Sequence, residues 1–286
     1  NWAYTLNKSS SIDIFAQPNQ STQQLLDSKS LSYPCKKLFL EPFFKGIFLD
    51  SSLKTSARLF MYYLKCFIFG KAAIPKKGIQ AIPEQLAKQI KPEKLLLNQE
   101  VIAIKNNLLE TKDHKKIHTD IICCATDALS AASLFNLPTP KFQSVYNLYV
   151  ETEEPIMKTD TLYLDGYTTQ NINNFHNVSS IMNPSNSKQL LSFTALPQHS
   201  KQKLYEKNLL EQTQTYFPYN APFKPVAFFP IHYAVPQQHT NTNSLNLKFN
   251  YNQIYFCGDW TFQGSIQGAL ESGKQIAQAM YQKIIE

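Results

Sequence analysis

The most informative stretch of this sequence is residues 258–273, which read Gly258-Asp259-Trp260-Thr261-Phe262-Gln263-Gly264-Ser265-Ile266-Gln267-Gly268-Ala269-Leu270-Glu271-Ser272-Gly273. It holds four of the eight glycines of the chain. Glycine makes up about 3% of this chain against about 7% of an average protein, so a window of this size should hold about half a glycine. A chain so poor in glycine keeps it where no side chain fits, at positive φ or where backbone meets a ligand or another backbone.

The flanking residues predict a strand, a turn and a helix. Residues 254–257 form a short apolar run typical of a buried strand, and residues 268–285 have the apolar spacing of a helix. Such a strand delivers Asp259 to the carboxyl edge of a sheet, where ligands of open α/β folds bind. Free amides from Ser265 to Gly268 at the helix N-terminus favour an electron-rich ligand atom. On physical grounds alone, a strand-turn-helix with glycines needed only for packing stays an open alternative.

This stretch resembles the C-terminal flavin motif of the FAD-dependent amine oxidoreductases, the superfamily of monoamine oxidase, protoporphyrinogen oxidase and phytoene desaturase. The motif reads Gly-Asp, a short gap, then Gly-Ser-x-x-Gly-Ala-x-x-Ser-Gly, and every fixed position is matched. The resemblance implies FAD as the cofactor, with Asp259 hydrogen-bonded to the ribityl chain. It also implies that the flavin ring meets Gly258, Gly264 and the backbone of Ser265, Ile266 and Gln267, where amide donors stabilise the reduced state.

Other stretches are similar to the same family in the expected order. Residues 78–87 look like a family turn and helix, although Lys77 replaces the first glycine of the family pattern. Residues 98–104 resemble a strand in which the valine, Val101 here, contacts adenine through its backbone. Residues 120–126 look like the strand that returns beneath the cofactor, and residues 43–60 resemble the helical region of desaturase-like members.

The chain departs from the family pattern in two ways. No Gly-x-Gly-x-x-Gly is present, because no two of the glycines are two residues apart. In the family this fingerprint opens the chain and holds the FAD diphosphate. We therefore expect a flavin-binding layer that is incomplete at its N-terminus and binds FAD poorly by itself. True amine oxidases have a tyrosine where this chain has Ser265, which favours the branch with larger, apolar substrates.

The order of these stretches predicts an α/β fold: a layer of the FAD/NAD(P)-binding reductase type with an inserted α+β substrate domain. We expect residues 1–75 to form the helical part of the substrate domain, and residues 76–128 the middle piece of the FAD-binding domain. Residues 129–246 are expected to add an antiparallel sheet and a helix to the substrate domain. Residues 247–286 are expected to form the C-terminal piece of the FAD-binding domain.

Several local expectations can be compared with the structure. After Ser52 the sequence predicts a helix with Leu59, Phe60, Tyr63 and Phe67 on its buried face. The apolar run 121–125 predicts a strand buried on both faces. Strands are expected at 144–151, 161–164 and 189–195, with a helix at 199–217. The Asn-rich segments 171–177 and 241–252 are expected to be loops.

Composition and charge limit the classes of partner. Hydrophobic residues make up 43% of the chain, which is typical of a globular protein, yet no apolar run reaches the roughly 20 residues of a membrane span. Of the 28 basic residues only Arg58 is an arginine, and the lysines are scattered, so the net charge of +7 predicts a solvated surface and no nucleic-acid partner. Peripheral contact with a membrane and the oligomeric state stay open.

The cysteines predict the compartment. Cys35, Cys66, Cys123, Cys124 and Cys257 have no zinc-like spacing, so no metal site is expected. An odd number of cysteines in a chain of this size predicts reduced thiols in the cytoplasm. We expect them to act as small buried apolar side chains.

The predicted function is that of an FAD-dependent oxidoreductase. It would transfer a hydride from a C–H bond of an organic, apolar small molecule to the flavin. The flavin performs this chemistry, so no catalytic side chain is named. The alternative is a truncated remnant or a binding module of the same family that no longer catalyses.

Overall fold

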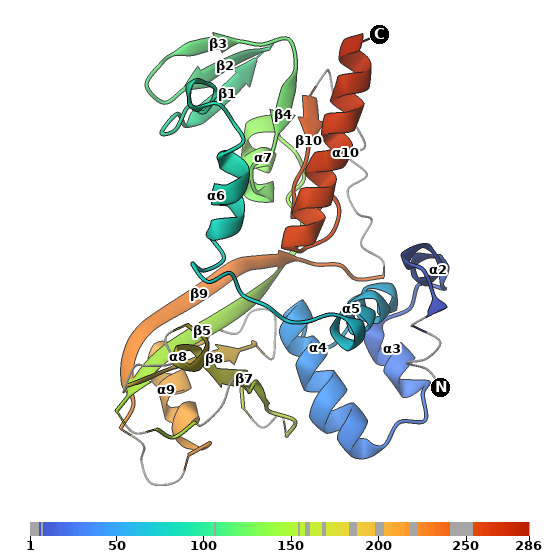
Figure 1. The fold of residues 1–286 in the computed structure, drawn as a ribbon, viewed down its shortest axis with the longest axis vertical. Helices are drawn as coiled ribbons and strands as arrows, with labels where there is room; N and C mark the ends of the chain where they lie inside the picture. The colour runs from blue at the N-terminus through green and yellow to red at the C-terminus, as the bar shows by residue number, and fades with distance from the viewer. Residues whose placement is uncertain are drawn as a thin grey trace. The chain divides into compact units, whose positions relative to one another are not determined.

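A computed structural model describes residues 6, 8–105, 107–153, 155–157, 161–167, 170–182, 188–197, 203–217, 222–240 and 254–285. The chain divides into two compact units, each made of two separate stretches of sequence (Figure 1). Unit 1 comprises residues 1–70 and 142–242, and unit 2 comprises residues 71–141 and 243–286. None of the helices in the described residues combines the length and the apolar character needed to cross a bilayer.

Unit 1 begins with short helices packed around one apolar core. These are α2 (Ser11–Ala16), α3 (Thr22–Asp27), the π-helical turn η1 (Pro34–Leu40), α4 (Glu41–Phe48) and α5 (Ala57–Phe69). Ser10 and Ser21 start α2 and α3 with capping boxes, which satisfy backbone donors of the first turn. The side chains of Phe44 and Phe60 are fully buried where α4 meets α5, with ring centroids 4.3 Å apart. Aromatic packing between these two helices therefore holds this part of unit 1 together.

The expected buried face of α5 is correct only in its first half. Leu59 and Phe60 are buried, and Tyr63 is partly buried against the same core. Phe67 is exposed, because the last turn of α5 extends beyond this core. Its ring packs edge-on against Phe43 at 4.9 Å.

The second part of unit 1 is a five-stranded antiparallel sheet with the strand order β6-β7-β8-β5-β9. Its elements are β5 (Phe142–Thr152), β6 (Tyr163–Leu164), β7 (Ile172–Asn177), α8 (Val178–Met182), β8 (Gln189–Ala195), α9 (Glu206–Gln214) and β9 (Lys224–Pro236). Leu148 on the long strand β5 pairs with Phe193 of β8 on one side and with Phe228 of β9 on the other. These side chains form a core with Leu209 of α9, so α9 covers one face of the sheet.

Two strands of this sheet differ from the sequence-based expectation. Residues 171–177 are not a loop, because Ile172–Asn177 forms β7, which is hydrogen-bonded between β6 and β8. The amides of the buried residues Asn173 and Asn177 donate to the carbonyl oxygens of Pro42, at 3.0 Å, and of Met157, at 3.4 Å. The other unexpected strand is β9, and it accommodates prolines because it lies at the edge of the sheet. The Asn-rich segment 241–252 lies outside the described residues.

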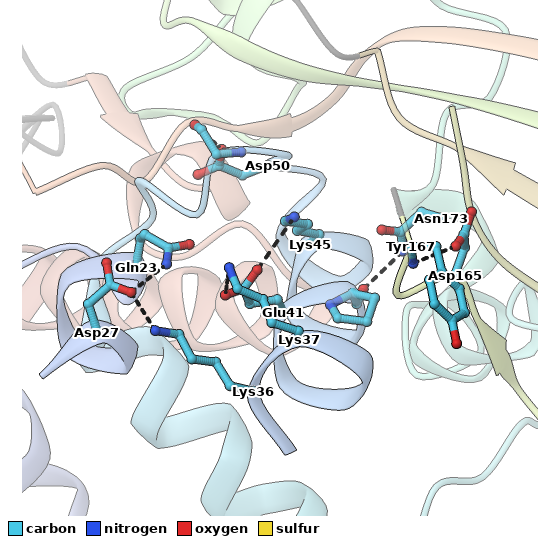
Figure 2. A network of polar contacts seen from close by, with 12 residues as sticks. Gln23, Asp27, Lys36, Lys37, Glu41, Lys45, Asp50, Asp165, Tyr167 and Asn173 are labelled. Atoms are coloured by element: carbon cyan, nitrogen blue, oxygen red, sulfur yellow. Dashed lines mark hydrogen bonds and ion pairs between the residues drawn. The ribbon is translucent and has the colours of Figure 1, made fainter. Parts of the chain in front are cut away.

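A polar network connects the helices of unit 1 with β7 (Figure 2). The buried carboxylate of Glu41 lies 2.7 Å from Lys37 Nζ and 3.9 Å from Lys45 Nζ. Burial lowers the pKa of Lys45, and the nearby Glu41 opposes this shift. Next to Glu41, the carbonyl oxygen of Pro42 accepts the hydrogen bond from Asn173. Removing either lysine would leave the buried Glu41 carboxylate with a single cationic partner, which would weaken this network.

Unit 2 contains two small sheets. Strands β1 (Val101–Lys105), β2 (Leu108–Thr111) and β3 (Lys116–His118) form an antiparallel sheet, and β4 (Ile122–Cys124) pairs in parallel with β10 (Ile254–Phe256). Its helical elements are α6 (Ala81–Ala87), η2 (Pro92–Lys94), α7 (Ala128–Phe135), η3 (Asp259–Thr261) and α10 (Ile266–Ile285). Helix α10 lies along β10 (Figure 1), and Ile276 packs there with Tyr255 and Cys257. The division into units falls after residue 141, so α7 belongs to unit 2.

The expectation that β4 is buried on both faces is wrong. Ile122 and Cys124 are buried, whereas Cys123 between them is exposed. The reason is that α10 covers this face of the sheet over β10 and leaves β4 open beside it. Cys66 on α5 is also exposed and Cys35 is only partly buried, so the expectation of buried cysteines is correct for Cys124 and Cys257 alone.

Candidate functional site

The candidate site begins where the parallel strands of unit 2 end. Residues 254–256 of β10 pair with residues 122–124 of β4, and Cys257 N–H extends the pairing by donating to the Cys124 carbonyl at 3.0 Å. Gly258 and Asp259 therefore leave the sheet at the carboxyl end of both strands. This is the edge at which open parallel sheets bind their ligands.

Gly258 has a backbone conformation that favours glycine, with φ +146°. A Cβ at this position would lie 2.7 Å from the indole Nε1 of Trp260. The Gly258 N–H donates to Ser272 Oγ at 2.9 Å, and this hydroxyl donates to the Ala269 carbonyl at 2.9 Å. These bonds fix the start of the turn to α10.

Trp260 forms the buried side of the turn. Its indole N–H donates to the Thr126 carbonyl at 3.0 Å, which ties the turn to the segment that follows β4. Its ring also packs against Phe256, with centroids 6.2 Å apart. The turn after β10 is therefore anchored to both strands of the sheet.

The carboxylate of Asp259 is half-buried at the first position of η3. Burial raises the pKa of Asp259, and backbone N–H donors at Trp260 and Asp259 partly oppose this shift. Within the described chain, no charged side chain contributes to the shift. Asp259 is thus a desolvated acceptor without a cationic partner, which suits a hydroxyl donor from a ligand.

Helix α10 starts two residues earlier than expected, and Ser265 is the residue before its first turn. Ser265 Oγ accepts a hydrogen bond from Gly268 N–H at 2.9 Å, as an N-cap side chain does. A Cβ on Gly268 would lie 1.9 Å from the Gln263 carbonyl oxygen, so glycine is required by the close approach of two backbone segments. Gly273 was expected to serve a similar contact, but a Cβ there would meet no atom within 4 Å.

The first turn of α10 presents two amides without a partner in the described part of the chain. Gly268 and Ala269 donate to Ser265, whereas the N–H groups of Ile266 and Gln267 make no hydrogen bond to the other described residues. Both residues are exposed. Together with the helix dipole, such amides favour an electron-rich ligand atom.

The structure thus brings six of the seven predicted site residues into one turn: Gly258, Asp259, Gly264, Ser265, Ile266 and Gln267. The seventh, Val101, starts β1 in the three-stranded sheet of unit 2, and its pairing with β2 is irregular between Val101 and Ala103. Three further residues position the turn and were not among the predicted site residues: Trp260, Ser272 and Thr126. A signal was present for Trp260, because the chain has only two tryptophans.

Unit 1 offers a different kind of surface. Phe229 and Ile231 on β9 are 49% and 44% exposed and pair with Asn147 and Val145 of β5, on the sheet face opposite the core formed with α9. Tyr149 packs edge-on against Phe229 at 5.9 Å. This row of aromatic and aliphatic side chains suits an apolar molecule.

Comparison with known proteins gives a family match and a fold match. Residues 7–281 match the family model of the flavin-containing amine oxidoreductases. No curated protein sequence matches the chain.

Several solved structures are similar in fold. An oxidoreductase from Methanosarcina mazei has a TM-score of 0.70 and 16% identity, and the match covers 96% of this chain and 70% of that one. A candidate protoporphyrinogen oxidase from Exiguobacterium sp. has a TM-score of 0.69 and 11% identity, with 99% and 71% covered. Wild-type putrescine oxidase bound to putrescine has a TM-score of 0.66 and 12% identity, with 98% and 72% covered.

Proposed function

Because the chain belongs to the flavin-containing amine oxidoreductases and is an FAD-dependent oxidoreductase, we propose that unit 2 holds the flavin ring at the turn between β10 and α10. In this proposal unit 2 is the FAD/NAD(P)-binding reductase-type layer. Unit 1 is the substrate domain, with residues 142–242 inserted between two pieces of that layer. When bound, FAD would accept a hydride from a C–H bond of the substrate.

Asp259 is the residue proposed to hold the ribityl chain. Burial has already removed part of the water around the Asp259 carboxylate. A ribityl hydroxyl that donates to this carboxylate would supply the hydrogen bond that the lost water no longer provides. Gly264 follows η3 and has no side chain, so a planar ring would approach its backbone closely. Gly258 is proposed to contribute through its backbone, because the Trp260 indole fills the space of its missing side chain.

The N-terminus of α10 is proposed to face the pyrimidine edge of the flavin ring. The N–H groups of Ile266 and Gln267 are oriented by the helix, and Ser265 fixes the first turn through its bond to Gly268. Donors that are held in place before the reaction stabilise developing negative charge without reorganisation. These residues would therefore favour the reduced state of the bound cofactor.

Val101 is proposed to contact the adenine through its backbone. The irregular pairing beside it supports this role, because an interrupted ladder leaves backbone groups available to a ligand.

An organic, apolar small molecule is the proposed substrate. The open face of the sheet in unit 1 supports this class through Phe229 and Ile231. Beside them, the amide of Asn147 donates to the hydroxyl oxygens of Ser192 and Thr194, so the same face also has polar groups at its middle. A molecule with an apolar body and one polar group fits this pattern.

The single observation that carries the proposal is the turn between β10 and α10. It holds the half-buried Asp259 carboxylate beside Gly258 at positive φ, and the amides of Ile266 and Gln267, which have no partner among the described residues. Asp259→Ala is expected to weaken FAD binding by about tenfold or more, because it removes a charged acceptor. The measurement is a titration of flavin fluorescence with the purified full chain.

Glu271→Gln is the matched control, because it removes a carboxylate from the same motif outside the proposed contacts. Equal FAD affinity in the Asp259→Ala and Glu271→Gln variants would reject the assigned site. Flavin binding without turnover of any substrate would favour the alternative, a binding module of this family.

A further inference from the structure

Two cysteines lie side by side on the parallel strands of unit 2. Cys123 on β4 is level with Tyr255 of β10, and Cys257 is two residues further along. Because residues two apart on a strand point to the same face, both thiols lie on one face of the sheet. Their Sγ atoms are 3.7 Å apart, and both are free thiols.

The two thiols differ in their access to solvent. Cys123 is exposed, whereas Cys257 is 8% exposed and packs near Ile276 of α10. A small reagent from solution can thus reach the pair from the side of β4, where Cys123 is exposed. The sulfur of Cys257 lies behind it, within contact distance.

The contact also changes the acidity of the pair. A hydrogen bond from the Cys123 thiol lowers the pKa of Cys257 to about 7, against the effect of burial. The pKa of Cys123 is raised, because its proton is held by the neighbouring sulfur. A fraction of the pairs therefore carries one thiolate near neutral pH, and the thiolate is the reactive form of cysteine.

We propose that Cys123 and Cys257 are an oxidation site that forms a reversible disulfide with hydrogen peroxide as the oxidant. The thiolate sulfur attacks one peroxide oxygen, the O–O bond breaks, and hydroxide leaves, so that this sulfur becomes a sulfenic acid. The second thiol attacks the sulfenic sulfur, the S–S bond forms, and the sulfenic oxygen leaves as water. Two thiols and one hydrogen peroxide thus give one disulfide and two waters.

The bond requires a movement of the backbone as well as of the side chains. A disulfide has an S–S length of about 2.0 Å, so the sulfurs must approach each other by about 1.7 Å. Because the two cysteines are diagonal neighbours, with Cα atoms about 8 Å apart by strand geometry, the end of β10 must also shift toward β4. The bond would link β4 to β10 at the residue directly before Gly258. Oxidation would therefore fix the strand end that carries the turn, whether or not the turn binds flavin.

The test uses the full chain, treated or not treated with hydrogen peroxide at neutral pH and then alkylated. Peptide mass spectrometry is expected to show a reductant-sensitive link between the peptides of Cys123 and Cys257, lighter by two hydrogen atoms. Cys66 is the internal reference, because it is exposed and belongs to the other unit. If both members of the pair remain alkylated while Cys66 is oxidised, the proposal is wrong.

A matched pair of variants identifies the partner of Cys257. Cys123→Ser is expected to abolish the linked peptides, and Cys124→Ser to retain them, because the Cys124 thiol contacts the Thr126 hydroxyl, at 3.3 Å, whereas the Cys257 thiol contacts that of Cys123. A link that persists in Cys123→Ser would overturn the proposal. Cys123 is exposed, so its serine variant is expected to fold, and fragmentation of the wild-type linked peptides decides between Cys123 and Cys124 independently.

Discussion

Units 1 and 2 differ in how much apolar surface they bury. Unit 1 buries two large apolar cores, one among its helices and one under its sheet, and it encloses the carboxylates of Glu41 and Asp50. In unit 2, α6 buries no side chain, and Leu96, Leu97 and Ile102 are exposed. The glycine-rich turn of unit 2 consists of backbone amides, glycines and the half-buried carboxylate of Asp259. The apolar packing that stabilises the fold is thus concentrated in unit 1, whereas the features suited to ligand binding lie in unit 2.

This difference has a consequence for binding. A ligand that binds the folded form of a thinly packed unit adds its binding free energy to the stability of that unit. Unit 2 should therefore gain more protection from its cofactor than unit 1. Amide hydrogen exchange resolves the two units, because it reports local opening residue by residue.

The largest expected effect comes from the core of unit 1. Phe193 is fully buried and stacks near Phe175, with centroids 5.1 Å apart, so Phe193→Ala should cost about 3–5 kcal/mol. Exposed Phe229→Ala is the control, with an expected change within about 0.5 kcal/mol. Hydrogen exchange should accelerate in β8 and remain unchanged in α10. Equal acceleration in α10 would show that the two units unfold together.

The next largest expected effect is a difference in stability between alanine substitutions at two glycines of α10. Gly268→Ala should destabilise unit 2 by roughly 3 kcal/mol, because its Cβ would collide with the Gln263 carbonyl. Gly273→Ala should stabilise the helix by about 0.5–1 kcal/mol, since its Cβ meets open space. Thermal unfolding of both variants provides the measurement. A stable Gly268→Ala variant would contradict the described turn.

Trp260→Phe tests the anchor of the turn. Loss of the indole N–H leaves the Thr126 carbonyl without this donor, with an expected cost of about 1 kcal/mol. The effect should be confined to unit 2 and should appear as faster exchange in residues 258–264. Faster exchange in the sheet of unit 1 would weaken the contrast between the units.

The smallest expected effect is a pH dependence at Asp259. Its pKa is raised in the folded state, so the native protein binds more protons above the ordinary carboxyl value of 3.8. Unit 2 should therefore lose stability as the pH rises from this value through the folded-state pKa, and Asp259→Asn should remove that loss. Chemical unfolding across this pH range is the measurement.

Asp127, in the same unit, is expected to change stability with pH in the opposite direction. Hydrogen bonds from the hydroxyl and the amide of Ser130 lower its pKa, so its contribution is present above the ordinary value and is lost as the pH falls through the folded-state pKa. Asp127→Asn should thus weaken unit 2 at neutral pH, whereas Asp259→Asn should strengthen it slightly and still weaken FAD binding. Loss of stability in both variants would contradict the burial described for Asp259.

The sequence predicted those parts of the fold in which local chemistry is sufficient. The strand at 189–195 and the strand-turn-helix at 254–285 have clear apolar patterns, and the glycines mark the turn at Gly258 and Gly268. The side chains that anchor this turn were not predicted. Trp260 and Ser272 act through distant partners, which a single sequence does not reveal.

The errors have tertiary causes. Strand β7 contains Asn173 and Asn177, whose buried amides find acceptors on other segments, and this pairing overrides the preference of asparagine for loops. The interior prolines of β9 are tolerated because the strand lies at an edge. Cys123 is exposed because α10 covers the neighbouring strand.

The most direct test of the central claim is the visible difference spectrum of the purified full chain during titration with FAD. If the turn after β10 holds the flavin, the wild type should perturb the flavin bands in a saturable way, and the Asp259→Ala variant should need about tenfold more FAD for the same change. A wild type that leaves the flavin bands unchanged at every FAD concentration would contradict flavin binding by this chain. Equal titration curves for the wild type and Asp259→Ala would contradict the assignment of the site.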